Sequence, residues 1–269
     1  MKKLVIFFIL IFVAVNLYAC GGITNNNVED STQIQDQTND DEQKNDNEQE
    51  IDIVPGDEHP YIGTKSADLS YISKATDIII DGQKDAFYYD GTIITIDEPN
   101  LNYFRKGPKV SSAIAYIVSD YDFINIYIEV VDSNIDYSNK TVWEKDSVGI
   151  LLDFNYYREK ETFGSDTQEL MNNIGYINIA VDGTFELYNA YLETEYSDKI
   201  ETDTMETDNG YSIEMKLPII NNFTGNKIGF EPLIIDAYYG CRQGVYTWDI
   251  DGSEMWHYTH VAGTLILKD

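Results

Sequence analysis

Cysteine is scarce in this sequence, since only two of the 269 residues are cysteines, Cys20 and Cys241. A framework of several disulfides is therefore excluded, and the fold must be stabilised by a hydrophobic core. If Cys20 is modified, as argued below, no intramolecular disulfide can form. We then expect Cys241 to be a small buried hydrophobic residue in a strand-rich segment.

Basic residues are also few, with 18 lysines and arginines against 47 aspartates and glutamates and a net charge of −29. Proteins that bind nucleic acid contact its phosphates through clustered lysine and arginine, so this balance argues against nucleic acid as a partner. The same negative charge repels anionic polymers. Uncharged sugars are therefore favoured over acidic ones as ligands.

Helical periodicity is missing from the chain. No stretch repeats apolar residues every 3.6 positions over several turns, so long helices are not expected. A parallel α/β fold needs crossover helices between its strands and is excluded for that reason.

Motifs of common enzyme classes are missing as well. The chain contains no G-x-S-x-G, H-E-x-x-H, Walker or glycine-rich nucleotide motif. Its three histidines, His59, His257 and His260, form no ligand cluster with cysteine. Two carboxylates can hydrolyse a glycosidic bond, but among 47 acidic residues such a pair would arise by chance. Because no second domain supplies a catalytic cleft, we predict a non-catalytic protein.

The first residues have the order of a secretion signal, with two lysines followed by an unbroken apolar run at 4–15. This run is shorter than the roughly 20 residues that span a bilayer, which favours cleavage. Residues 17–20, Leu-Tyr-Ala-Cys, resemble the lipobox of bacterial lipoproteins, in which the cysteine is lipidated. We therefore predict a signal peptide at 1–19 and a lipid anchor on Cys20, which would hold the protein on the bacterial cell envelope, facing the periplasm or the exterior. An ordinary secretion signal that contains a cysteine is the alternative.

Residues 20–60 are rich in Asn, Asp, Gln and Glu and contain almost no aromatic side chains. Such a segment cannot bury enough apolar surface to fold. About forty flexible residues span roughly 35 Å. We predict a disordered acidic tether that separates the following domain from the membrane, and a specific acidic binding tail is the alternative.

From residue 61 onward, short runs of alternating apolar and polar residues are separated by turn-forming clusters. In one run, Ile126, Ile128 and Val130 share one face of the strand, and the residues between them share the other. Residues 208–210 predict a hairpin turn. The predicted strands are 112–118, 123–132, 147–154, 176–181, 184–188, 200–206, 211–217, 228–237, 245–250 and 263–267. So many short strands predict an all-β fold, a single two-sheet antiparallel β-sandwich at 61–269.

Four segments of this domain, 80–87, 143–148, 228–237 and 240–267, occur in the order found in family 9 carbohydrate-binding modules. Trp143 opens the most recognisable of them, which reads Trp-Glu-Lys-Asp-Ser-Val. The domain therefore resembles that family, which is related to the DOMON-like sandwiches. The resemblance implies a β-sandwich that binds carbohydrate.

In that family two tryptophans clamp a sugar ring between their faces, and the matching positions here are Trp143 and Trp256. A pyranose has apolar C–H faces and a rim of hydroxyls, which flat aromatic walls and polar groups complement. Gly149 stands where the family places a carboxylate, Asn178 where it places an arginine, and Ser253 where it places an asparagine. The resemblance thus implies that Asn178 and Ser253 contact the sugar hydroxyls.

Alternatives remain for several of these residues. Trp143 and Trp256 have polar neighbours, which favours a ligand site over packing in the core, whereas Trp248 lies in an alternating strand and is expected to be a core residue. Arg242 is expected to brace a loop through a nearby carboxylate, with a sugar contact as its second role.

Metal and haem ligands can also be weighed from the sequence. Asp249, Asp251 and Glu254 are closely spaced oxygen ligands, but they lack the spacing of an EF-hand, so a structural calcium ion stays unassigned. No other cofactor is expected. The haem-binding relatives of the fold offer an alternative function, for which the candidate axial ligands are His257, His260, Met215 and Met255.

The sequence thus predicts a surface lipoprotein that binds an oligosaccharide or polysaccharide for enzymes or transporters encoded elsewhere and contacts the membrane through its lipid anchor only. A structural lipoprotein without a small ligand and an accessory part of a glycoside hydrolase system in polysaccharide catabolism are further alternatives.

Overall fold

The computed structural model describes residues 63–72, 78–99, 112–120, 122–156, 174–188, 196–220, 223–249 and 261–268. All of them belong to one unit that spans 58–269. The predicted signal peptide, the anchor at Cys20 and the tether lie outside the described residues. Within the described ranges, no helix is long and apolar enough to cross a membrane.

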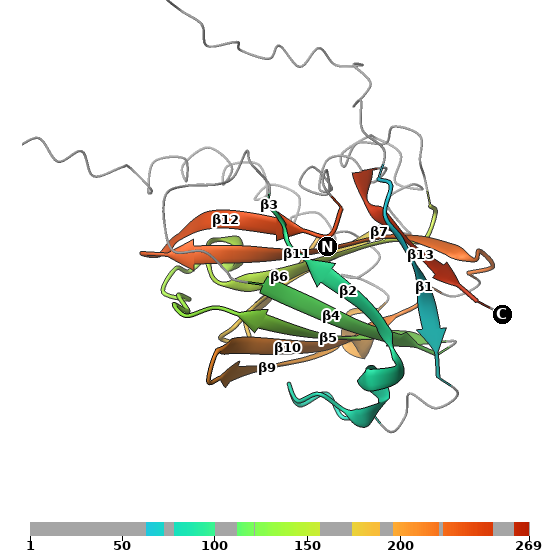
Figure 1. Cartoon of the computed structure of the whole chain (residues 1–269), viewed down its shortest axis with the longest axis horizontal. Coiled ribbons are helices and arrows are strands. Elements are labelled where there is room, and N and C mark those ends of the chain that lie inside the picture. The colour runs from blue at the N-terminus through green and yellow to red at the C-terminus, as the bar shows by residue number, and fades with distance from the viewer. Residues whose placement is uncertain are drawn as a thin grey trace, which may run out of the picture. The chain divides into compact units, whose positions relative to one another are not determined.

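The described chain is built almost entirely of strands, with three short 3-10 helices (Figure 1). The helices are η3 (Ala86–Asp90), η5 (Val142–Glu144) and η7 (Ser197–Lys199). The strands are β1 (Ser66–Tyr71), β2 (Thr92–Ile96), β3 (Glu98–Pro99), β4 (Ser112–Ser119), β5 (Phe123–Val131), β6 (Ser147–Asp153), β7 (Ile174–Ala180), β8 (Phe185–Tyr188), β9 (Glu201–Thr207), β10 (Gly210–Pro218), β11 (Lys227–Tyr238), β12 (Cys241–Thr247) and β13 (Gly263–Leu267).

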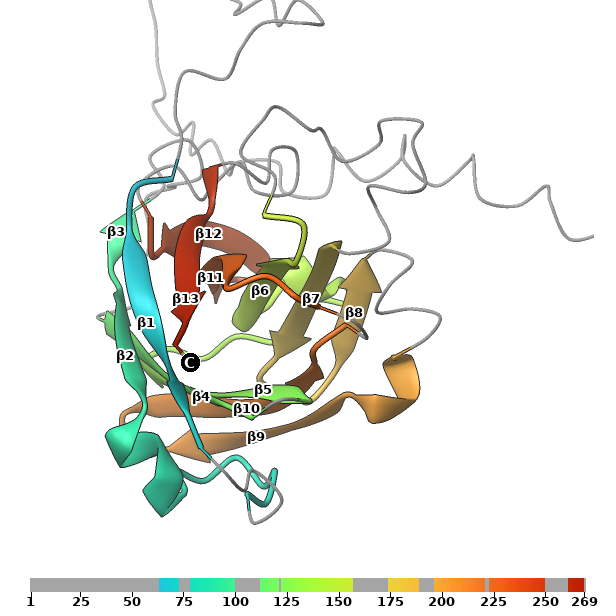
Figure 2. The same ribbon diagram turned by 90° about the vertical axis from the view of Figure 1, so that its right-hand side faces the viewer.

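These strands form two layers that pack face to face (Figure 2). We call sheet A the layer of β8, β7, β6, β11 and β13 in that order, in which β12 also pairs with β11 and β3. Sheet B contains β4, β5, β10 and β9, with β2 paired to β4. The prediction of an all-β two-sheet sandwich is confirmed.

Strand β1 departs from the predicted antiparallel pattern. Its first four residues pair in parallel with β13 of sheet A, and Ser70 and Tyr71 then pair in parallel with β4 of sheet B. The two layers are therefore joined through β1 into one curled sheet. The other strand pairs recorded in the described ranges are antiparallel.

Apolar side chains that alternate along the strands fill the space between the two layers. Ile126, Ile128 and Val130 are buried in the main core, as their shared face predicts. The opposite face of β5 is also covered, because Tyr88 of η3 packs against Tyr127 with ring centroids 5.6 Å apart. Helix η3 thus closes the outer side of sheet B.

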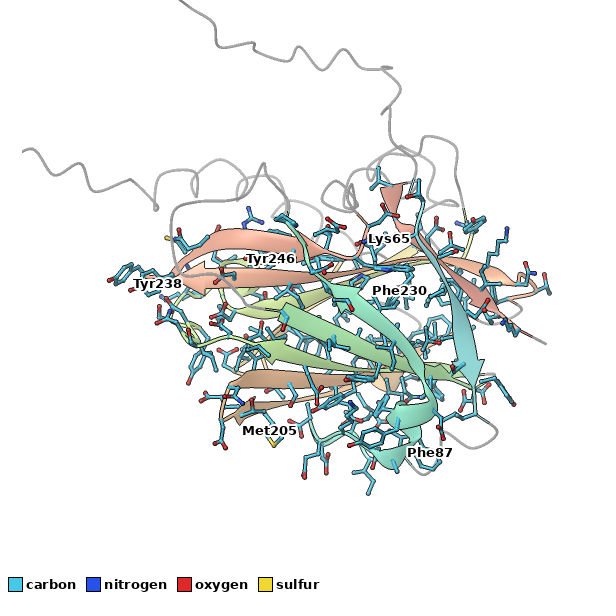
Figure 3. All side chains as sticks on the ribbon, viewed as in Figure 1. Lys65, Phe87, Met205, Phe230, Tyr238 and Tyr246 are labelled. Atoms are coloured by element: carbon cyan, nitrogen blue, oxygen red, sulfur yellow. The ribbon has the colours of Figure 1, made fainter. Side chains whose placement is uncertain are left out.

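Phe230 illustrates the packing between the layers, whereas Tyr238 lies at the tip of the β11–β12 hairpin (Figure 3). Trp248 is buried and lies 6.2 Å from Phe230 between ring centroids, so its prediction as a core residue is confirmed. Cys241 begins β12, is only half-buried and is disulfide-bonded, so its prediction as a small buried hydrophobic residue outside any disulfide is wrong. The reason is its place at the hairpin end, where the strand leaves the core.

The predicted hairpin turn joins Thr207 of β9 to Gly210 of β10. Gly210 has φ of 154°, and a Cβ at this position would lie 2.0 Å from the carbonyl oxygen of Val130. Only glycine allows the turn to approach β5 so closely.

Candidate functional site

Trp143 lies at the surface, in the connection between β5 and β6. It is 40% exposed, while its neighbour Val142 is buried and holds η5 against the fold. Packing in the core is thereby excluded for this indole. A large, half-exposed aromatic face is the property that a sugar-stacking residue requires.

The backbone around Trp143 is fixed by its acidic and basic neighbours. Glu144 Oε2 accepts a hydrogen bond of 2.8 Å from the backbone N–H of Arg242, so this carboxylate braces the start of β12 through the backbone, and bracing by the Arg242 guanidinium stays a prediction. The buried Lys145 ammonium donates to Asp182 Oδ2 at 2.6 Å and to Thr184 Oγ1 at 2.9 Å, in the turn between β7 and β8. Trp143 is therefore held between two turns of sheet A.

A row of three residues crosses β6, β7 and β8 on the outer face of sheet A. Gly149 is opposite Asn178, and Asn178 is opposite Glu186. Residues that are directly opposite point to the same side of a sheet. We call Gly149, Asn178 and Glu186 the polar row.

Asn178 is 0% exposed, and neither its amide nitrogen nor its amide oxygen has a hydrogen-bond partner. A buried polar group without a partner costs about 1–3 kcal/mol. Among the described residues none supplies a partner for this amide, which could hydrogen-bond a sugar hydroxyl or an ordered water molecule.

Tyr176 explains why a glycine stands at position 149. A Cβ at Gly149 would lie 2.6 Å from the Tyr176 hydroxyl and 2.8 Å from Leu233 Cδ1, so the space of a larger side chain is already filled. Burial raises the pKa of Tyr176, and the charges of Arg242 and Glu186 shift this pKa down and up respectively. The Tyr176 hydroxyl thus lies against Gly149 and within the electrostatic influence of Arg242 and Glu186.

Tyr176 and Glu186 were missed by the sequence analysis. The signal for them was present, because Tyr176 and Asn178 alternate along one predicted strand and Glu186 lies on the next. The carboxylate of Glu186 thus lies two strands away from position 149, where the resemblance leads one to expect a carboxylate.

Trp256 and Ser253 lie outside the described residues, as do Asp251, Glu254, Met255, His257 and His260. The ends of the strands around that segment are nevertheless well defined. Glu231, fully buried in β11, accepts hydrogen bonds from the backbone N–H groups of Trp248, Asp249 and Gly263 at 2.7, 2.9 and 3.2 Å. One carboxylate therefore ties together the two strand ends that flank residues 250–260.

Two other candidate ligands, Asp249 and Met215, already have structural roles in the described part of the chain. Asp249 Oδ2 accepts from the backbone N–H groups of Thr64 and Lys65, both at 2.7 Å, so its carboxylate fixes the chain before β1. Met215 is buried in the main hydrophobic core between the sheets. Neither arrangement favours a calcium loop at Asp249 or the haem alternative with Met215 as ligand.

Comparison with known proteins places these features in a family. The family model described as carbohydrate family 9 binding domain-like matches residues 80–269. The chain therefore belongs to this family, whose members are non-catalytic carbohydrate-binding modules. The resemblance drawn from the four sequence segments is confirmed.

Two curated relatives share 25% identity with the chain. Exoglucanase XynX of Acetivibrio thermocellus aligns over 192 residues, which are 70% of this chain and 16% of the relative. Endo-1,4-beta-xylanase A of Thermoanaerobacterium saccharolyticum aligns over 207 residues, which are 76% of this chain and 16% of the relative. The chain thus spans about one sixth of the length of these enzymes.

Solved structures show the same fold. A family 9 module from Caldicellulosiruptor kristjanssonii in complex with cellotriose has a TM-score of 0.59 and 20% identity, and covers 76% of this chain and 94% of the module. The corresponding glucose complex has a TM-score of 0.59 and 19% identity, with 76% and 96% covered.

Proposed function

We propose that this chain is a non-catalytic receptor that binds a neutral oligosaccharide or the end of a polysaccharide. Trp143 and Trp256 would form the two walls of the site, and Asn178, Ser253, Glu186 and Arg242 would contact the hydroxyls. The observation that carries the proposal is the half-exposed indole of Trp143, fixed beside sheet A, whose outer face holds the unpaired amide of Asn178. Apolar walls and a polar rim are the features that a pyranose needs.

The relatives narrow the class of sugar. Their names are those of an exoglucanase and an endo-1,4-β-xylanase, and the structural neighbours hold cellotriose and glucose. We therefore favour chains of β-linked glucose or xylose. A glycan array probed with this chain tests the proposal, and we expect signals on cello- or xylo-oligosaccharides. An array without a signal on any neutral glycan would leave the structural lipoprotein as the better interpretation.

Asn178 offers a test that separates binding from stability. Replacement by leucine removes a buried amide without partners and keeps a similar volume, so Asn178→Leu should raise the free energy of unfolding by about 1 kcal/mol. The same change removes a contact to a sugar hydroxyl and should weaken glycan binding about tenfold. Urea denaturation and titration calorimetry measure the two effects.

Asn125 of β5 is the matched control, because its amide is also fully buried without hydrogen-bond partners but lies in sheet B. Asn125→Leu should stabilise the chain in the same way and leave glycan affinity unchanged. Equal affinities in the two variants would remove Asn178 from the site.

We further propose that Cys20 carries a lipid and anchors the domain on the cell envelope through the acidic segment. In a bacterial host fed with an alkyne-labelled fatty acid, the chain should be labelled, Cys20→Ser should lose the label, and Cys241→Ser should keep it. A disulfide between the two cysteines in the mature, envelope-bound protein, detected by a mobility change on reduction, would contradict lipidation.

A further inference from the structure

The hairpin that joins β11 to β12 ends in an exposed aromatic side chain. Among the described residues, Tyr239 has the most exposed large apolar side chain, at 82%. Tyr238 and Cys241 are opposite each other, so Tyr239 and Gly240 form a two-residue turn at the hairpin tip (Figure 3). The ring centroids of Tyr238 and Tyr239 are 3.9 Å apart. Two neighbouring aromatic rings thus lie at this tip.

The backbone of this turn is unfavourable for a tyrosine. The φ angle is 54° at Tyr239 and 68° at Gly240. Positive φ at both central residues is the requirement of a type I′ turn, which prefers asparagine, aspartate or glycine at the first of them. A bulky residue with positive φ is an outlier, and such outliers occur mostly at functional sites. Because the ring of Tyr239 is exposed, packing in the core does not explain its presence.

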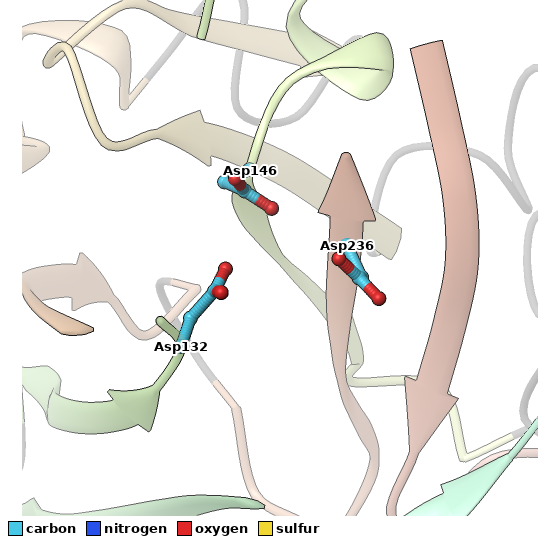
Figure 4. Close-up of side chains that lie close together, drawn as sticks. All are labelled: Asp132, Asp146 and Asp236. Atoms are coloured by element: carbon cyan, nitrogen blue, oxygen red, sulfur yellow. The ribbon is translucent and has the colours of Figure 1, made fainter. Parts of the chain in front are cut away.

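Carboxylates of the β5–β6 connection hold the hairpin in place. Figure 4 shows Asp146, at the end of this connection, beside Asp236 of β11. Asp146 Oδ1 accepts a hydrogen bond of 2.7 Å from the backbone N–H of Ala237. Asp136 Oδ2 accepts one of 2.7 Å from the backbone N–H of Gly240, within the turn itself. The position of the tip is therefore fixed against the connection.

The same connection carries Trp143. Its neighbour Glu144 accepts a hydrogen bond of 2.8 Å from the backbone N–H of Arg242, which comes three residues after Tyr239. Three residues of chain span at most about 11 Å. Tyr239 and Trp143 therefore belong to the same end of the sandwich.

Strand β11 leads from the polar row to the hairpin tip. Leu233 is directly opposite Gly149 of the polar row, and Tyr239 follows six residues later. Six residues of a strand cover about 20 Å. One sugar ring at the polar row is too short to reach the tip, whereas a longer oligosaccharide reaches it.

We propose that Tyr239 determines specificity for ligand length, by stacking on a further unit of a β-linked glucose or xylose chain whose first units lie at Trp143. This inference rests on the proposed function and extends it. A phenol ring offers a flat apolar surface to the C–H face of a pyranose. A neutral chain fits this position, because the net charge of −29 repels anionic polysaccharides.

Titration calorimetry of the whole chain with cello-oligosaccharides and xylo-oligosaccharides, from the disaccharide to the hexasaccharide, tests the inference. We expect the preferred hexasaccharide to bind the wild type about five- to tenfold more tightly than the disaccharide. Tyr239→Ala should bind the disaccharide as the wild type does and lose the gain for longer chains. Tyr239→Phe keeps the ring and should retain most of the gain.

Tyr239→Gly separates stacking from the conformation of the turn. Glycine adopts positive φ without strain, so the thermal midpoint should rise by about 2–4 °C while the gain with chain length is lost. Tyr89→Ala is the matched control, because Tyr89 is 67% exposed but lies in η3, on the outer side of sheet B. This variant should keep the gain.

Equal gains with chain length in the wild type and Tyr239→Ala would overturn the inference. A loss by the same factor for the disaccharide and the hexasaccharide would also overturn it, because a distorted hairpin affects every ligand alike. If short sugars bind the wild type and longer ones bind no more tightly, this inference fails and the proposed function stands. If no oligosaccharide of either series binds, the proposed function fails, and this inference fails with it.

Discussion

Glu231→Ala is expected to lower the free energy of unfolding by roughly 3–5 kcal/mol, which is among the largest effects of a single change in this chain. The carboxylate is fully buried and accepts hydrogen bonds from three backbone N–H groups, those of Trp248, Asp249 and Gly263. Alanine would leave all three donors buried without an acceptor. Each unpaired donor costs about 1–3 kcal/mol, and the three costs are not fully additive.

The two acceptor oxygens of Glu231 explain why replacement by glutamine is also expected to destabilise the chain. Oε1 accepts from Trp248 and Asp249, and Oε2 accepts from Gly263. Glutamine has one acceptor oxygen, so in Glu231→Gln its amide N–H₂ must face at least one backbone donor. We expect this variant to lose about half as much stability as alanine.

Urea denaturation measures both changes, with Glu206→Ala as the control. Glu206 lies at an exposed position of β9 and should change stability by less than about 0.5 kcal/mol when truncated. A Glu231→Ala variant as stable as Glu206→Ala would show that the three donors find other acceptors. Glycan binding should also weaken in the Glu231 variants, because the carboxylate joins the strand ends that flank the segment of Trp256.

Most strands could be predicted because apolar alternation decides them. The predicted bounds of β13 coincide with the observed ones, and the core positions of β5 were assigned correctly. The strand β1 was missed although Ala67, Leu69 and Tyr71 alternate with polar residues, since the run is short and Leu69 is its only buried residue. Its strand conformation comes from pairing with β13 and β4, which no local pattern encodes.

Residues of the candidate site could likewise be predicted where the signal lies in neighbouring residues, and not where it depends on distant ones. The polar neighbours of Trp143 predicted its exposure correctly. The calcium ion that was left unassigned at Asp249 was suggested by short spacing alone, yet this carboxylate accepts hydrogen bonds from the backbone of Thr64 and Lys65. The proximity of Asp132, Asp146 and Asp236 escaped prediction because Asp236 is distant from the other two in the chain and meets them only when β5, β6 and β11 are assembled.

Trp143→Ala is expected to weaken glycan binding at least about thirtyfold, which corresponds to roughly 2 kcal/mol, the range of aromatic hot spots. The free energy of unfolding should change by less than about 1 kcal/mol, because the indole is 40% exposed and Val142 provides the buried contact of η5. Titration calorimetry with cellotriose and urea denaturation measure these two quantities. Trp143→Phe keeps a smaller apolar face and should retain part of the affinity.

Tyr71→Ala is the matched control, because Tyr71 is an aromatic residue of similar exposure, 44%, at the end of β1 that pairs with Ser119. That end of β4 adjoins the start of β5, whereas the connection of Trp143 begins after the end of β5. A loss of affinity in both variants would point to a general effect of aromatic truncation. Unchanged affinity in Trp143→Ala would exclude the sugar clamp, since a stacking wall that contributes nothing to binding is not part of the site. A loss of affinity in Trp143→Ala alone, with unfolding unchanged, assigns the indole to the ligand, because a purely structural residue would lower stability before binding.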